Sequence, residues 1–165
     1  MDELFAAMQR LHKEYGSRAV LDLVGFYDDD FYKERVERLV ADGIAVFHGF
    51  QTDPIPYYAA ADCVVLPSYH EGMSNVLLEA AAIGRPVITS DIPGCREAVE
   101  DGKSGLLCKA QDPDSLYTQM CRIAEMPAAD RRDMGRAARR KMEREFDKKL
   151  VVERTVCAIF PQQSK

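Results

Sequence analysis

The stretch that decides the fold is DCVVLPSYHEGMSNVLLEAAAIGRPVITS, residues 62–90. It begins with an apolar run, Cys63 to Leu66, that is rich in β-branched residues and too short for a helix, and Pro67 ends this run. A polar loop, a helix and a second apolar run at Pro86 to Thr89 follow. This order is typical of a parallel sheet, so the loop lies at the carboxyl end of a strand, where ligands of such sheets bind.

Two glutamates flank the predicted junction between this loop and the helix. Glu71 is on the loop, and Glu79 is four residues after Asn75 on the helix. Residues four apart lie on the same face of a helix, so Glu79 is expected to face the same site as Asn75 and the loop. The first helical turn leaves backbone N–H groups without partners, which favours an anion. The spacing therefore predicts two carboxylates that bind hydroxyl groups beside a bound anion. On spacing alone, Glu79 also fits an ordinary solvated helix residue.

The rest of the chain alternates short apolar strands with helices. Strands are predicted at residues 19–24, 44–48, 63–66, 86–89 and 106–109. Helices are predicted at residues 1–15, 96–99, 113–125, 128–146 and 148–160. Three further helices are predicted to begin at residues 28–30, at residue 54, and near residues 74–76, and the last of these carries Glu79. This alternation predicts an α/β fold, a doubly wound, Rossmann-like parallel sheet of five strands with helices on both faces, in one domain over residues 1–165.

Composition fits one compact domain and excludes several classes of protein. The 165 residues are 47% hydrophobic. No run approaches the roughly 18 uncharged apolar residues of a membrane span, and the start of the chain is no signal peptide, so we expect a cytoplasmic protein. Five cysteines without a CxxC pair indicate neither a disulfide framework nor a zinc site, and they fit small buried hydrophobic residues.

Charge is segregated toward the C-terminus. The net charge is −5, yet residues 131–149 hold nine Lys or Arg against four Asp or Glu. This basic segment is compatible with peripheral contact to an anionic membrane. More often such a run is one solvated helix face, and nucleic acid is not expected as a partner.

Other polar residues have ordinary explanations. Asp28 to Asp30 fit either a metal-binding cluster or a helix start, and we favour the helix start because Asp is a preferred N-cap. His48 and His70 fit core or rim positions better than a general base. No metal or cofactor is predicted, and a dinucleotide dehydrogenase is disfavoured because no GxGxxG follows a strand.

Four linked motifs carry a family resemblance. Residues 71–80 (EGMSNVLLEA), followed by residues 84–87 (GRPV), resemble the Glu-x7-Glu signature of the retaining group 1 (family 4) glycosyltransferases of the GT-B fold. Residues 92–97 (IPGCRE), 101–107 (DGKSGLL) and 112–116 (DPDSL) continue the family pattern in the same order. The resemblance covers nearly the whole chain, and it implies the nucleotide-sugar-binding domain of such an enzyme.

The resemblance also implies roles for side chains. The residue matching Glu79 binds the ribose hydroxyls of the nucleotide. The residue matching Glu71 binds hydroxyls of the transferred sugar and is the one expected to act in catalysis. Gly49 and Phe50 match the loop beside the nucleobase, although a turn glycine with a packed Phe explains them equally well. Arg96 and Glu97 match a motif on a loop facing the cleft, where a structural role and a donor contact are equally open.

The remaining contacts that the resemblance implies are made by the main chain. Amides matching Met73 and Ser74 approach the sugar, and those matching Asn75 and Val76 reach the diphosphate. Gly72 is useful where the backbone must approach a ligand closely.

The activity implied is transfer of a sugar from a UDP-sugar to an acceptor hydroxyl with retention, in polysaccharide or glycolipid synthesis. The acceptor, a glycan or lipid-linked sugar, would be bound by an N-terminal domain that this chain lacks. The resemblance implies no catalytic metal, no protein nucleophile and no cofactor. Two alternatives stay open: a non-catalytic donor-binding subunit that needs a partner chain, and a sugar-nucleotide epimerase of the same fold.

In the family, a strand and a basic phosphate clamp precede the helix that matches Asp2 to Tyr15. Because this chain begins at the helix, we expect it to be inactive alone and its sheet to lack a central strand. Unpaired ladder groups cost roughly 1–3 kcal/mol each when buried. The gap is therefore expected either to close, giving strand order 2-1-3-4-5 with Val24 and Leu66 on neighbouring strands, or to be filled by another chain in a homo-oligomer.

Overall fold

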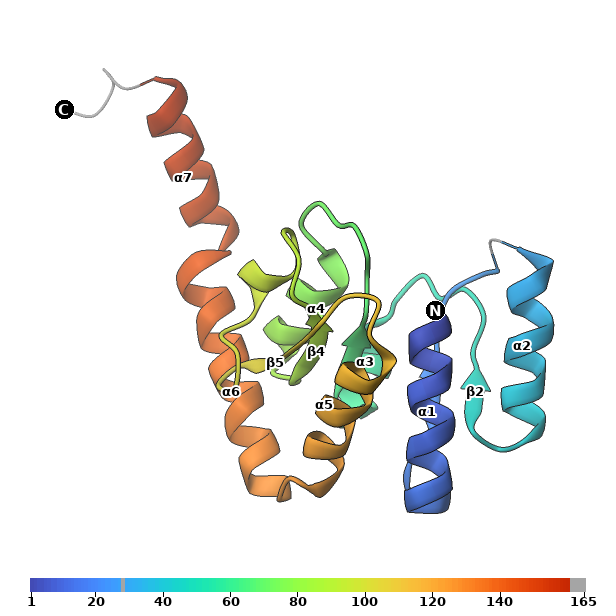
Figure 1. The fold of residues 1–165 in the computed structure, drawn as a ribbon. Coiled ribbons are helices and arrows are strands. Elements are labelled where there is room, and N and C mark those ends of the chain that lie inside the picture. Colours follow the sequence, from blue (N-terminus) through green and yellow to red (C-terminus); the bar gives the residue numbers. More distant parts are fainter. Residues whose placement is uncertain (28, 161–165) are drawn as a thin grey trace.

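The computed structural model describes residues 1–27 and 29–160 (Figure 1). The α/β class is confirmed, and each predicted strand is present within one or two residues of its predicted bounds. The helices are α1 (Asp2–Tyr15), α2 (Asp30–Ala41), α3 (Ile55–Ala60), α4 (Asn75–Ile83), α5 (Pro113–Glu125), α6 (Ala128–Glu145) and α7 (Lys148–Ile159), with short 3-10 helices η1 (Gly16–Arg18) and η2 (Arg96–Ala98). The strands are β1 (Leu21–Leu23), β2 (Ala45–Phe47), β3 (Val64–Leu66), β4 (Val87–Ser90) and β5 (Gly105–Cys108).

The five strands form two parallel sheets, and not the single sheet that we predicted. One sheet pairs β1 with β2, and the other has the order β3-β4-β5. In the second sheet Val65 lies opposite Ile88, and Ile88 lies opposite Leu106. The predicted closed order 2-1-3-4-5 is wrong, because β1 and β3 belong to different sheets and Val24 and Leu66 are not on paired strands.

Helices cover both faces of the strands, as a doubly wound fold requires. Alternate residues of each strand point to opposite faces. Val65 and Ile88 pack into a core shared with α1, α2 and α5. Val64 and Val87 pack into a second core with α4 and η2. The strands of the β3-β4-β5 sheet are therefore packed from two sides, which explains why they read as continuous hydrophobic runs, whereas Asp22 of β1 and Val46 of β2 are exposed.

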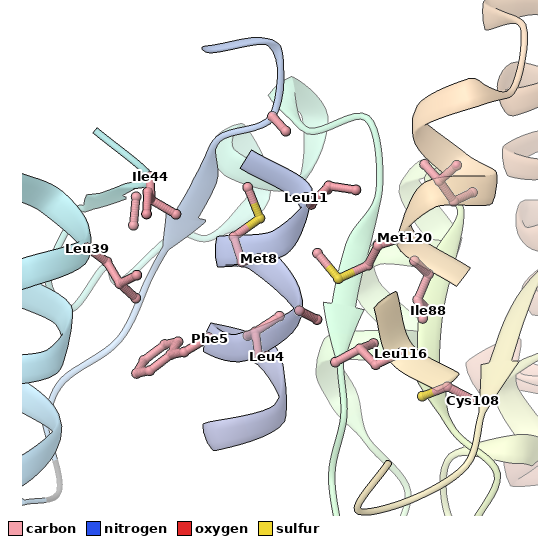
Figure 2. Packing of buried hydrophobic residues seen from close by; sticks show 14 of the residues in the cluster. Leu4, Phe5, Met8, Leu11, Leu39, Ile44, Ile88, Cys108, Leu116 and Met120 are labelled. Atoms are coloured by element: carbon pink, nitrogen blue, oxygen red, sulfur yellow. The ribbon is translucent and has the colours of Figure 1, made fainter. Parts of the chain in front are cut away.

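The position of α1 explains why the two sheets stay separate. Its apolar face contributes Phe5 and Met8 to the larger core, where they meet residues of α5 and of both sheets (Figure 2). Helix α1 leads through η1 directly into β1, while β3 is held by its pairing with β4. The distance between β1 and β3 is thus set by helix packing, since moving them together would displace this buried apolar face.

Close backbone contact joins α4 to α6, on the face opposite α1. Gly84 ends α4 in the left-handed region at φ 84°. A Cβ added to Gly135 of α6 would lie 1.9 Å from the carbonyl oxygen of Gly84, so only glycine fits there. This contact brings Ala81 and Ala138 together in a small third cluster with Met142. It fixes α4, the helix on which Glu79 lies.

Helix α7 projects from the body of the domain and has no buried residue (Figure 1). The prediction that all cysteines are buried is wrong for Cys157, which is exposed on this helix because α7 packs on no core. Cys95 and Cys108 are buried, and Cys63 and Cys121 are half-buried. Within residues 1–27 and 29–160, no helix has the length and apolar character needed to cross a membrane.

Candidate functional site

The loop after β3 and the start of α4 form the centre of the candidate site. Pro67 ends β3, and the loop runs to Ser74, which has extended backbone angles at the N-cap of α4. Ser74 is 4% exposed, and its side chain makes no capping hydrogen bond. The first N–H groups of a helix have no partner within the helix, so this uncapped end offers donors to an anion.

Glu71 is held on the loop by a neighbouring hydroxyl. Ser68 Oγ donates a hydrogen bond of 2.8 Å to Glu71 Oε1, and both residues are half-buried. Burial raises the pKa of the Cys95 thiol, and the negative charges of Glu71 and Glu97 raise it further. Glu71 is therefore oriented before any ligand arrives.

Glu79 lies one turn inside α4 and is exposed. The Tyr58 hydroxyl of α3 donates a hydrogen bond of 3.2 Å to Glu79 Oε2. Burial raises the pKa of Tyr58 to about 12, and the charge of Glu79 contributes to that rise. Tyr58 therefore stays protonated at neutral pH and remains a donor to Glu79.

The predicted main-chain contacts lie in one continuous segment between the two glutamates. Gly72 and Asn75 are exposed, Val76 is half-buried, and Met73 is 45% exposed. With Ser74 buried, the backbone of this segment follows the surface at the start of α4. The structure thus brings Glu71, Glu79 and the helix N-terminus together.

Gly49 and Phe50 lie on the loop that follows β2, in the other sheet. Gly49 has φ 67° and its carbonyl accepts a hydrogen bond of 3.0 Å from the Gly25 amide. Phe50 is 67% exposed, and its ring centroid is 6.4 Å from that of Phe26. This loop leads into α3, whose Tyr58 contacts Glu79. The connection links the predicted nucleobase loop to the glutamate pair.

The remaining polar residues that the sequence analysis considered, Asp29, His48 and His70, lie in ordinary structural surroundings. Asp29 caps α2 by accepting a hydrogen bond of 2.9 Å from the Phe31 amide, in agreement with a helix start, whereas Asp28 lies outside the described residues. His48 Nε2 is 2.7 Å from Asp22 Oδ1, and His70 is exposed on the loop. Among residues 1–27 and 29–160, no group of three or more His, Cys, Asp or Glu side chains could hold a metal ion.

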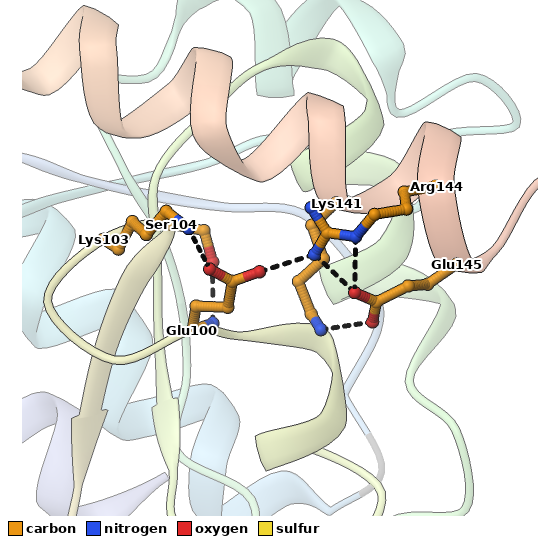
Figure 3. A network of polar contacts seen from close by, with 6 residues as sticks. All are labelled: Glu100, Lys103, Ser104, Lys141, Arg144 and Glu145. Carbon is orange, nitrogen blue, oxygen red and sulfur yellow. Dashed lines mark hydrogen bonds and ion pairs between the residues drawn. The ribbon is translucent and has the colours of Figure 1, made fainter.

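The basic segment is largely neutralised by acidic neighbours. On α6, Arg139 pairs with Glu143 at 2.9 Å, and Arg144 pairs with Glu100 at 2.6 Å (Figure 3). These pairs agree with a solvated helix face, and the second of them ties α6 to the turn before β5.

Two residues that donate hydrogen bonds to the glutamate pair were not predicted from the sequence: Tyr58 and Ser68. Ser68 carries a weak signal, because a hydroxyl three residues before Glu71 can reach its carboxylate. Tyr58 carries none, since its position in a short helix predicts a packing residue. The Pro93-Gly94 pair predicts a turn but not which loop that turn will touch.

The fold is that of a doubly wound α/β domain, with the candidate site at the carboxyl end of a parallel strand. Residues 1–126 match the family described as "Glycosyl transferases group 1". The chain is 33% identical over 155 residues to the glycogen synthase of Mycobacterium tuberculosis, covering 93% of this chain and 37% of that protein. The chain therefore belongs to the group 1 glycosyltransferases, and it spans about a third of the length of this relative.

Solved structures share the fold. The sucrose-phosphate synthase of Thermosynechococcus elongatus matches with a TM-score of 0.76 and 29% identity, covering 96% of this chain and 42% of that one. Anabaena Alr3699/HepE in complex with UDP matches with a TM-score of 0.74 and 18% identity, covering 93% of this chain and 52% of that one. The latter likeness concerns the fold alone.

Proposed function

We propose that residues 1–165 form the donor-binding domain of a retaining glycosyltransferase that uses a UDP-sugar. The observation that carries the proposal is the pair Glu71 and Glu79, with seven residues between them, on either side of an uncapped helix N-terminus. Membership of the group 1 family supports a sugar-transfer reaction. The presence of UDP in the related HepE fold supports a uridine nucleotide. The acceptor, a glycan or a lipid-linked sugar, would be bound by a further domain or partner.

In this proposal the chain acts mainly through positioning and electrostatics. Negative charge develops on the departing diphosphate, and the backbone N–H groups of Asn75 and Val76, at the start of α4, would stabilise that charge. Glu79 binds the ribose and Glu71 binds the transferred sugar, which holds the anomeric carbon in register with the acceptor. The leaving phosphate would help to deprotonate the acceptor hydroxyl.

The first prediction tests the nucleotide site through Glu79→Ala. The variant loses charge-assisted hydrogen bonds to the ribose, which contribute about 1.5–3 kcal/mol, so we expect affinity for UDP to fall about tenfold or more. Calorimetric titration with UDP, GDP and ADP measures the loss and identifies the base.

Glu34→Ala is the matched control, because Glu34 is an exposed glutamate of α2 outside the site. The control is expected to bind UDP as the wild type does. If folded Glu79→Ala keeps the wild-type affinity for UDP, Glu79 does not belong to the site.

A further inference from the structure

Two loops that belong to different strand-helix units touch beside the glutamate pair. Gly94, on the loop after β4, has φ 87°. A Cβ placed on Gly94 would lie 1.7 Å from the carbonyl oxygen of Gly72 and 2.4 Å from that of Glu71. Ser74 N–H also approaches the Gly94 carbonyl at 3.4 Å. The backbone at Gly94 therefore supports the loop that carries Glu71, and no side chain fits between them.

The conformation of the Gly94 loop is held by Glu97. The Gly94 amide donates a hydrogen bond of 2.8 Å to Glu97 Oε2, and an ionised acceptor makes such a bond stronger than a neutral one. Glu97 lies on η2, whose ends are fixed in the core, since Cys95 is 0% exposed and Ala98 is 1% exposed. Both belong to the cluster that contains Leu77 of α4. The carboxylate thus extends from a fixed turn to the Gly94 amide, and it adds to the hydrogen bonds that the Cys95 and Arg96 amides donate to the Ile92 carbonyl in the same loop.

We propose that Glu97 is a positioning residue, which holds the Gly94 loop against residues 71–74 and so keeps the Glu71 carboxylate aligned for the donor sugar. Glu97 does this without touching the ligand. The alignment of Glu71 for the sugar rests on the proposed function, whereas the contact between the Gly94 loop and residues 71–74 does not depend on it.

The loop contact is tested without any ligand. Hydrogen exchange is measured by mass spectrometry on peptides covering residues 69–76 and 31–41 in the wild type, Glu97→Ala and Glu97→Gln. We expect faster exchange in residues 69–76 of Glu97→Ala only, because the Gln amide oxygen can still accept the Gly94 hydrogen bond. Residues 31–41 of α2 report global stability and are expected not to change. Equal exchange at residues 69–76 in the wild type and Glu97→Ala overturns the proposal.

The effect on the donor is tested by calorimetry with UDP and UDP-glucose. We expect Glu97→Ala to bind UDP-glucose about three- to tenfold more weakly and UDP about as the wild type does, because Glu79 holds the nucleotide from α4. Glu97→Gln is expected to restore most of the affinity. Equal losses for both ligands, or equal losses in both variants, contradict positioning. If the wild type binds neither ligand, the proposed function fails, and the exchange measurement still decides the role of Glu97.

Discussion

Glu71 and Glu79 differ in what holds them. Glu71 is half-buried on a loop and accepts a hydrogen bond from Ser68, whereas Glu79 is exposed on a helix and accepts one from Tyr58. A carboxylate has several acceptor sites, so one that accepts a hydrogen bond from a hydroxyl can still accept further hydrogen bonds from a ligand. Both glutamates are thus oriented as acceptors for hydroxyl groups, each from a different element.

A division of roles between the glutamates predicts different effects on two ligands. If Glu71 binds the sugar and not the nucleotide, Glu71→Ala is expected to weaken UDP-glucose binding about tenfold and to leave UDP binding nearly unchanged, since only the sugar hydroxyls lose their acceptor. Parallel calorimetric titrations with the two ligands measure this difference. Losses of the same size for UDP and UDP-glucose would show that the glutamates do not divide the donor in this way.

The sequence predicted the two glutamates because their spacing across a strand, loop and helix places them at one edge. It could not predict Tyr58, which reaches Glu79 from a helix 21 residues earlier. Nor could it predict that Gly94 touches Gly72, since that contact depends on how two loops fold over neighbouring strands. Local pattern determines which residues reach the edge, and packing between elements determines what orients them.

At the scale of elements, an ion-pair network attaches α6 to the turn before β5 (Figure 3). Glu100 accepts hydrogen bonds from Lys103 at 2.6 Å and from Arg144 at 2.6 Å. These bonds lower the pKa of Glu100 to about 2 from its ordinary value of 4.5. A carboxyl group whose pKa is lower in the folded state stabilises that state above its unfolded pKa.

This network predicts a pH-dependent difference between the wild type and Glu100→Gln. We expect the wild type to have the higher free energy of unfolding at neutral pH, and the advantage to disappear as the pH falls from about 4.5 through about 2, where Glu100 becomes protonated in both states. Urea denaturation at several pH values measures it. Because Glu100 is close to solvent, added salt is expected to reduce the difference. An advantage that is constant over this range would exclude the ionised carboxylate as its cause.

At the scale of the molecule, the sequence predicted the strands but not how they join. Each apolar run became a strand, because a short apolar run between chain-breaking residues is too short for a helix and fits a strand of a parallel sheet. Closure into one sheet depends instead on where α1 lies, and the packing of Phe5 and Met8 cannot be read from their helical spacing. The spacing gave the buried face of α1 but not the strands that it holds apart.

The two sheets therefore present strand edges without partners in the described chain. Val64 N–H donates to the carbonyl of Pro86, the residue before β4, so the backbone groups of Val65 point to the opposite edge of β3. In the same way Leu21 N–H donates to Ile44, which directs the backbone groups of Asp22 away from β2. A cavity of about 310 Å³ borders β1, lined by Leu23, Val24 and Phe5 among others.

Unpaired edges of this kind are sites at which another chain can add a strand. We expect the protein to associate reversibly as its concentration rises, since pairing at β1 or β3 would satisfy buried ladder groups. Sedimentation velocity over a range of concentrations measures the association.

Val24→Lys is expected to suppress this association, because a charged residue at the β1 edge opposes strand addition. Val40→Lys is the matched control, since Val40 is 42% exposed, close to the 40% of Val24, but lies on helix α2. A protein that stays monomeric at every concentration, or two variants that behave alike, would contradict strand addition at these edges. The helices around α1 would then be what covers the edges, and no second chain would be needed there.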